Sequence, residues 1–290
     1  MSTIRLGIYE KALISGPWPE FFEQVKAGGF HFVDLSVDET PERAARLDWS
    51  QEQRDAVRGA ARDAGVQIGG ICLSLHRRIM PGSADPEIRE QAREVYRKGI
   101  DLAHDLGVSV VQVAGYYAYY EEDDPGSRMR YIETLKDAMP YAAHKGIILA
   151  IENVDGNDIS SVQDAMAVVD ECHSPWVQIY PDVGNIAEHG GDATEELAAG
   201  SGHMVALHVK DVLPGEPRRI AFGTGVADFD AAFTELRRQD WDGRIMLEMW
   251  NDDSPDSLET CTNARRFIEE RLISAACIVQ PRHSEGGNTE

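Results

Sequence analysis

The chain has 290 residues, of which 42% are hydrophobic and 27% are charged, as in an ordinary globular protein. Its net charge of −22 repels polyphosphate backbones, which argues against a general nucleic-acid binder. No apolar stretch approaches the roughly 20 residues of a membrane helix, and the N-terminus lacks a signal-peptide pattern, so we expect a cytoplasmic protein with no membrane partner.

Short β-branched runs, many preceded by a glycine, alternate with polar loops and amphipathic stretches along the whole chain. Helical periodicity is clearest over 87–106 and over 160–172, where Ser160 or Ser161 is the expected N-cap. The runs predict eight strands, at 4–9, 32–36, 66–74, 108–114, 147–153, 177–182, 204–210 and 244–249.

Eight strand–helix units in a chain of this length favour a single closed (β/α)8 TIM barrel over an open doubly wound sheet. No early GxGxxG follows the first run, which disfavours a dinucleotide-binding fold. We expect one barrel domain over residues 1–275 and a disordered polar tail over 276–290.

The four cysteines are widely spaced and form no CxxC pattern, so neither a disulfide framework nor a zinc ribbon is expected. Most are expected to be small buried hydrophobic residues; they are Cys72, Cys172, Cys261 and Cys277.

Four consecutive predicted strands end in groups that can bind a metal: Glu152, Asp182, His208 and Glu248. Any one of them alone is better read as a solvated loop carboxylate or a structural histidine. Together, at the same end of neighbouring barrel strands, they predict a shared site at the barrel mouth. Three carboxylates and one imidazole suit one divalent cation, Mn²⁺, Zn²⁺, Co²⁺ or Mg²⁺, of which Mn²⁺ and Zn²⁺ are favoured.

These ligands resemble those of the xylose-isomerase-like sugar-phosphate isomerases and epimerases. More narrowly, the chain resembles the L-ribulose-5-phosphate (L-xylulose-5-phosphate) 3-epimerases over roughly residues 4–252. The segments that carry the resemblance are "LGIYEKAL" (6–13), "FVDLSVDE" (32–39), "RLDWSQEQR" (46–54), "ICLSLHRR" (71–78), "VQVAGYYAYYEE" (111–122), "YPDVGN" (180–185), "LHVKD" (207–211), "AFGTGVADF" (221–229) and "EMW" (248–250).

The resemblance implies a xylose-isomerase-like barrel that epimerises C3 of a ketopentose, with L-ribulose 5-phosphate and L-xylulose 5-phosphate as the expected pair. The reaction would pass through a cis-enediolate that the metal stabilises. Inversion at C3 calls for two acid/base groups, and Glu152 and Glu248 are expected to serve because their strands flank the other two ligands. A small sugar or sugar phosphate is the implied partner, and related barrels often form homodimers.

Other polar residues are candidates for substrate binding. Asn185 suits either a substrate hydroxyl or a local turn, and Lys210 suits a substrate oxygen or solvent. His76 and Arg77 follow the third strand and could hold a sugar or phosphate. After the seventh strand, Arg219 or its neighbour Arg218 offers charge beside a glycine-rich turn, a frequent phosphate location in barrels; Arg219 is the residue we select.

Three other functions remain open from the sequence. An aldose–ketose isomerase or inosose-type dehydratase would use the same four ligands. An endonuclease-IV-like repair enzyme would need more metals and a basic groove. A sugar-binding regulator without activity would not require both candidate glutamates. The roles of Glu10, of Asp155 and of the aromatic run 116–120 stay undecided.

Overall fold

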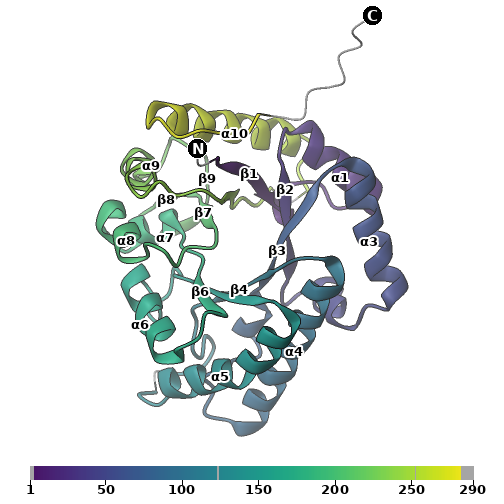
Figure 1. The fold of residues 1–290 in the computed structure, drawn as a ribbon, viewed down its shortest axis with the longest axis vertical. Coiled ribbons are helices and arrows are strands. Elements are labelled where there is room, and N and C mark those ends of the chain that lie inside the picture. Colours follow the sequence, from purple (N-terminus) through teal and green to yellow (C-terminus); the bar gives the residue numbers. More distant parts are fainter. Residues whose placement is uncertain (1–2, 123, 252, 282–290) are drawn as a thin grey trace, which may run out of the picture.

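The computed structural model describes residues 3–122, 124–251 and 253–281 and contains a ring of eight parallel strands surrounded by helices (Figure 1). The hydrogen-bonded order is β6-β5-β4-β3-β2-β1-β10-β7, so β1 to β6 lie side by side in chain order and β10 lies between β1 and β7. All eight predicted strands are confirmed, as β1 (Arg5–Tyr9), β2 (Phe32–Val37), β3 (Gln67–Leu73), β4 (Val110–Ala114), β5 (Ile148–Glu152), β6 (Val177–Ile179), β7 (Leu207–Val209) and β10 (Arg244–Leu247).

The ring closes between β6 and β7 through isolated bridges and not through a continuous ladder. Ile179 bridges Met204, and Asp182 bridges His208, where the His208 amide donates to the Pro181 carbonyl at 2.7 Å. The predicted TIM barrel is therefore confirmed, and its closure lies at two of the four candidate ligands.

The helices lie outside the strands and cover them (Figure 1). Ser161, one of the two predicted candidates, caps α6 (Val162–Cys172). Left-handed Gly107 and Gly146 end α4 (Pro86–Leu106) and α5 (Ser127–Lys145), so that a strand can follow. The helices are α1 (Trp18–Ala27), α2 (Pro41–Ala44), α3 (Gln51–Ala64), α4 (Pro86–Leu106), α5 (Ser127–Lys145), α6 (Val162–Cys172), α7 (Val183–Glu188), α8 (Ala193–Ala199), α9 (Phe229–Arg238) and α10 (Ser257–Ser274), with 3-10 turns η1 (Glu10–Ala12), η2 (Ala45–Asp48) and η3 (Ser74–Arg77).

Alternate residues of the strands belong to two separate apolar clusters. Leu149 and Ile151 of β5 belong to the layer between strands and helices, whereas Ala150 belongs to a smaller cluster with Phe32, Tyr180 and Met246. Because strand side chains alternate, Glu152 shares the face of Ala150. The pattern of β5 therefore aims Glu152 into the barrel.

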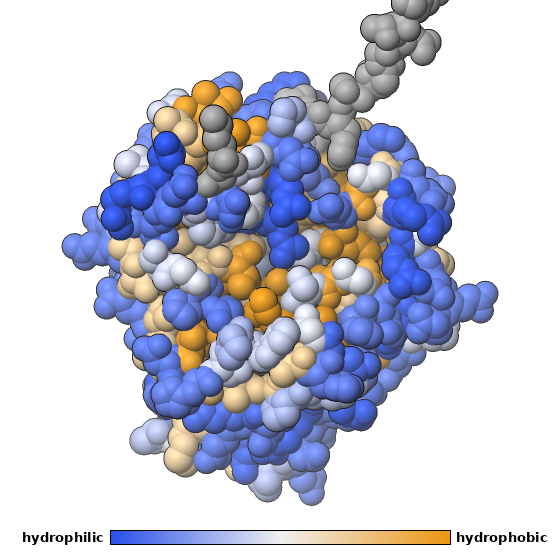
Figure 2. Space-filling view, viewed as in Figure 1, coloured by the Kyte–Doolittle hydropathy of each residue, from blue (hydrophilic) through white to orange (hydrophobic). Residues whose placement is uncertain are grey.

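The surface view is consistent with this layering (Figure 2). Apolar side chains gather near the middle of the viewed face, and hydrophilic side chains surround them. In the described part of the chain, no helix is long and apolar enough to cross a membrane.

Two features differ from the sequence-based expectation. A hairpin of β8 (Asp211–Leu213) and β9 (Glu216–Ile220) follows β7 where only a loop was expected. The tail was predicted to begin at residue 276, but residues 276–281 pack on the barrel: the Ile4 amide donates to the Ile278 carbonyl at 2.7 Å, and the Gln280 amide donates to the Ile4 carbonyl at 2.8 Å. Backbone pairing beside β1 fixes this segment, and the rest of the predicted tail, 282–290, lies outside the described residues.

Candidate active site

The four predicted ligands come together at the carboxyl ends of β5, β6, β7 and β10. One ligand atom from each of Glu152, Asp182, His208 and Glu248 lies within 4.8 Å of the others. Glu152 is the last residue of β5, Asp182 is the N-cap of α7, His208 lies in β7, and Glu248 directly follows β10. Barrel topology thus gathers residues that are 96 positions apart at the extremes (248 − 152).

Glu152 is held from two sides. His208 Nδ1 lies 2.7 Å from Glu152 Oε1, and the Gln112 side-chain amide donates to Glu152 Oε2 at 2.6 Å. All three side chains are buried. Two partners on one carboxylate fix its orientation, and Gln112 was not identified from the sequence.

Lys210 lies between the other two carboxylates. Its ammonium is 3.0 Å from Asp182 Oδ2 and 3.0 Å from Glu248 Oε2, and it is buried. Asp182 Oδ1 accepts from the amides of Gly184 and Asn185, as an N-cap does. Lys210 was expected to touch substrate or solvent, and it also compensates the acidic cluster.

Burial and neighbouring charges shift the pKa values of Asp182, Glu248 and His208. Burial raises the pKa of Asp182, and the charges of Glu248 and Glu152 add to this while Lys210 opposes it. Burial acts upward on Glu248 as well, but Lys210 and His208 lower its pKa overall. Burial alone would lower the pKa of His208, and the Glu152 carboxylate raises it instead to about 9. The cluster therefore attracts positive charge strongly.

The donor set fits a divalent cation. Three carboxylates and an imidazole within 4.8 Å match the ligands that Mn²⁺ and Zn²⁺ accept. Asp182 Oδ2 is fully buried and accepts no hydrogen bond of good geometry from any described residue. A cation would give this oxygen a partner beyond its ion pair with Lys210.

A cavity of about 180 Å³ opens above the cluster, and it is lined by Glu152 and Glu248 but not by Asp182 or His208. The two candidate acid/base residues are thus the members of the set that reach the cavity. Its wall also carries five basic side chains, Lys11, Arg77, Lys210, Arg218 and Arg219, of which Lys210 is paired with carboxylates of the cluster. The cavity can therefore accept a small polar molecule that carries negative charge.

The β8–β9 hairpin is tied across the cavity by a chain of polar contacts. Arg218 Nη2 lies 2.7 Å from Asp155 Oδ2, and the Tyr116 hydroxyl donates to Asp155 Oδ1. The Arg218 guanidinium also lies over the Trp250 ring at 5.8 Å from its centroid. Asp155, unassigned from the sequence, connects the segments after β4, β5 and β7, and Arg218 is as well placed as the selected Arg219.

His76 does not line the cavity, where its substrate contact was expected. The 3-10 turn η3 directs the ring outward, where Nε2 bonds to the Ala92 carbonyl at 3.2 Å and the ring packs on Tyr96 at 4.2 Å between centroids. Burial lowers its pKa to about 4. The same turn leaves Arg77 on the cavity wall, over the Tyr119 ring at 5.7 Å.

Asn185 and Glu10 have structural partners. Asn185 lines the cavity, and its side-chain amide donates to the Asn153 carbonyl at 2.7 Å. Its contact with a substrate hydroxyl stays a prediction. Glu10 is buried against Arg46, with two oxygen–nitrogen distances of 2.6 Å. Glu10 therefore supports the wall near Lys11 and is not exposed.

Lys11 and Trp250 are cavity residues that the sequence reading missed. Each lies just beyond the end of a strand, β1 or β10. Reading all eight strand ends for any polar or aromatic group, and not only for metal ligands, would have found both.

The chain matches the family model of the xylose isomerase-like TIM barrel over residues 22–271. It is 41% identical to L-ribulose-5-phosphate 3-epimerase UlaE of Escherichia coli O157:H7, over 95% of this chain and 97% of that protein. The protein of the same name in Salmonella paratyphi C gives the same identity and coverage.

Solved structures agree on the fold. L-ribulose 3-epimerase superposes with a TM-score of 0.80 at 18% identity, covering 94% of this chain and 96% of that chain. D-psicose 3-epimerase from Clostridium cellulolyticum H10 gives 0.79 at 17% identity, covering 92% and 99%. The chain belongs to the xylose isomerase-like TIM-barrel family, within the group of the L-ribulose-5-phosphate 3-epimerases. It is an enzyme of the sugar epimerase and isomerase class.

Proposed function

We propose that the enzyme epimerises C3 of a ketopentose phosphate and interconverts L-ribulose 5-phosphate and L-xylulose 5-phosphate. The observation that carries the proposal is the position of Glu152 and Glu248 on one small cavity, at the ends of strands that flank β6 and β7. The 41% identity to proteins named L-ribulose-5-phosphate 3-epimerase supports the choice of sugar.

Inversion at C3 needs a group that removes a proton on one face and another that returns a proton on the other. Glu152 and Glu248 are these groups in the proposal. Gln112 and Lys210 hold one oxygen of each carboxylate and thereby orient it toward the cavity. A carbon held between the two side chains could lose and regain its proton without turning over.

Glu152, Asp182, His208 and Glu248 would hold one divalent cation, Mn²⁺ or Zn²⁺ by preference. When bound there, such an ion would supply Lewis-acid chemistry to the carbonyl beside C3. Lys210 contacts Asp182 and Glu248 and would keep the site from carrying an excess of negative charge. His208 supplies the neutral donor that distinguishes this set from an all-carboxylate one.

The phosphate of the substrate would lie against the basic wall. Lys11, Arg77, Arg218 and Arg219 provide four cationic side chains around a cavity that also contains the two glutamates. Guanidinium groups bind phosphate oxygens through paired N–H donors, which favours the arginines as the direct contacts. Trp250 and Tyr116 supply the less polar part of the wall.

The experiment is to incubate the Mn²⁺-loaded enzyme with L-ribulose 5-phosphate in D₂O and follow the C3 proton by NMR. Deuterium uptake at C3 with formation of L-xylulose 5-phosphate is expected. Exchange at C1 with formation of an aldose would replace the proposal with an aldose–ketose isomerase. Equal turnover of unphosphorylated L-ribulose would remove the phosphate from the proposal.

Glu152→Gln and Glu248→Gln test the two proton-transfer groups. Each substitution keeps the shape and removes the base, so epimerisation should fall about 100- to 10,000-fold. Glu216→Gln, on the exposed hairpin end, is the matched control and should change turnover less than about twofold. Near-normal turnover in either Glu152→Gln or Glu248→Gln would rule out the two-base assignment.

A further inference from the structure

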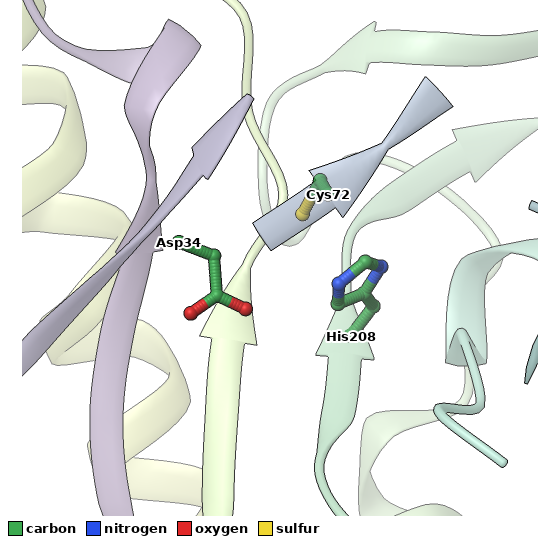
Figure 3. Close-up of side chains that lie close together, drawn as sticks. All are labelled: Asp34, Cys72 and His208. Carbon is green, nitrogen blue, oxygen red and sulfur yellow. The ribbon is translucent and has the colours of Figure 1, made fainter. Parts of the chain in front are cut away.

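A buried carboxylate lies inside the barrel, next to the four-residue cluster, and the two groups share His208. Asp34 of β2 is 1% exposed and shares a small interior space with Cys72 of β3 and His208 of β7 (Figure 3). Ligand atoms of the three lie within 4.8 Å of one another. Barrel interiors at this depth are ordinarily filled by apolar side chains, so this charge needs an explanation.

Two polar atoms in this space lack hydrogen-bond partners among the described residues. One is Asp34 Oδ1 and the other is His208 Nε2, the ring nitrogen that does not face Glu152. An acceptor and a possible N–H donor thus lie near each other in a region shielded from water. Buried polar groups are rarely left without partners, which makes this pair significant.

The surroundings hold Asp34 in place. The Tyr180 hydroxyl donates to Asp34 Oδ2 at 2.8 Å, and the Tyr180 ring packs on His208 at 4.2 Å between centroids. On β3, a Cβ at Gly69 would lie 2.4 Å from Asp34 Oδ1, and one at Gly70 would lie 3.1 Å from Oδ2. Two glycines therefore make the room that the carboxylate occupies.

The protonation pattern of His208 gives this arrangement a use. A neutral imidazole carries one N–H proton, and only its unprotonated nitrogen can ligate a cation. Nδ1 faces the cluster through Glu152, so the proton must stay on Nε2 if His208 is to act as a ligand there. A carboxylate facing Nε2 stabilises that tautomer and fixes the ring, as outer carboxylates do for ligating histidines.

We infer that Asp34 is a positioning residue that holds the proton of His208 on Nε2 and thereby prepares Nδ1 for a divalent cation. The inference rests on the proposed metal site and assigns Asp34 no contact with substrate. Cys72 fills the same space without contributing a charge.

The first test uses the wild-type enzyme loaded with diamagnetic Zn²⁺ and labelled with ¹⁵N-histidine. Long-range ¹H–¹⁵N correlation spectra identify the protonated nitrogen of each ring. The expected result is a proton on Nε2 of His208 and none on Nδ1. A proton on Nδ1 would overturn the inference, and it does so without any variant that could fail to fold.

The second test measures the dissociation constant of Mn²⁺ by the electron paramagnetic resonance signal of the free ion. Asp34→Asn should weaken binding about 10- to 100-fold, because an amide can donate to Nε2 and drive the proton to Nδ1. Cys72→Ala, in the same space, is the matched control and should stay within about twofold.

The outcomes separate this inference from the proposed function. Wild-type binding of Mn²⁺ with equally tight binding by a folded Asp34→Asn overturns the role of Asp34 alone. Failure of the wild type to bind Mn²⁺ or Zn²⁺ overturns the metal site and this inference together. A purely structural Asp34 would lower the melting temperature of the variant and leave its Mn²⁺ affinity unchanged.

Discussion

Two histidines at the mouth ends of barrel strands share nearly the same burial and have opposite chemistry. His76, after β3, is 2% exposed, and His208, in β7, is 1% exposed. The surroundings of His76 are a backbone carbonyl and the Tyr96 ring, and burial lowers its pKa to about 4. His208 faces Glu152, and its pKa rises to about 9.

The difference lies in the neighbouring charges and not in depth. Burial alone lowers the pKa of any histidine, so the rise at His208 comes from neighbouring carboxylates, first Glu152 and then Glu248 and Asp182. Where several strand ends supply carboxylates to one imidazole, the histidine is part of a polar site. Where a 3-10 turn rotates the ring toward a helix, it is a packing residue.

Replacing each histidine with an amide side chain should give the largest difference in activity between the two positions. His208→Asn should lower C3 epimerisation more than about 100-fold, because it removes the only nitrogen donor of the proposed ligand set. His76→Gln should leave kcat and KM within about twofold. Steady-state kinetics at saturating Mn²⁺ measure both, and comparable losses in the two variants would contradict the distinction.

The pH dependence of stability should show the cost of burying His76 in its neutral form. Its pKa is about 4 in the fold and near 6.5 when unfolded, so the unfolded chain binds the extra proton between these values. The free energy of unfolding should therefore fall as the pH decreases below 6.5, and at pH 4 the His76 contribution should have lowered it by about 3 kcal/mol.

Urea unfolding at several pH values between 4 and 7 gives the free energy of unfolding of the wild type and of His76→Gln. The contribution of His76 is the difference between the slopes of these free energies against pH. His144→Gln, at an exposed position of α5, is the control and should unfold with the wild-type slope. Identical slopes for the wild type and His76→Gln would show that His76 is accessible to protons in the folded state.

A smaller effect is expected at the edge of the cavity, where the charge pair is partly exposed. Asp155→Asn should release Arg218 from its 2.7 Å contact and raise KM for the phosphorylated ketose about tenfold, with kcat nearly unchanged. Arg237→Ala, which breaks an exposed pair with Asp240, is the matched control. A fall in kcat without a change in KM would place Asp155 in proton transfer and not in substrate positioning.

The ring of strands and its polar end could be predicted because both follow from simple periodicities. Glu152, Asp182, His208 and Glu248 each come at or just past the end of a buried run, and a parallel barrel brings such ends together. Local propensity also gave the cap at Ser161. These inferences need only the strand direction and the order along the chain.

Side-chain direction after a strand could not be predicted in the same way. The turn η3 decides that His76 points to α4 while Arg77 reaches the cavity, and no periodicity covers a four-residue 3-10 turn. The double ion pair of Lys210 depends on cross-strand distances that the sequence does not contain. Asp34 was detectable in principle, since it lies two residues from the inward-facing Phe32.

The closure of the ring has a thermodynamic result of its own. β6 and β7 share only isolated bridges, and one of these joins Asp182 to His208. Any ligand that binds both residues joins the two edges of the sheet at the junction that has no continuous hydrogen-bonded ladder. Occupancy of the site should therefore add RT ln(1 + [L]/Kd) to the free energy of unfolding. The barrel is then most stable in its ligand-bound state.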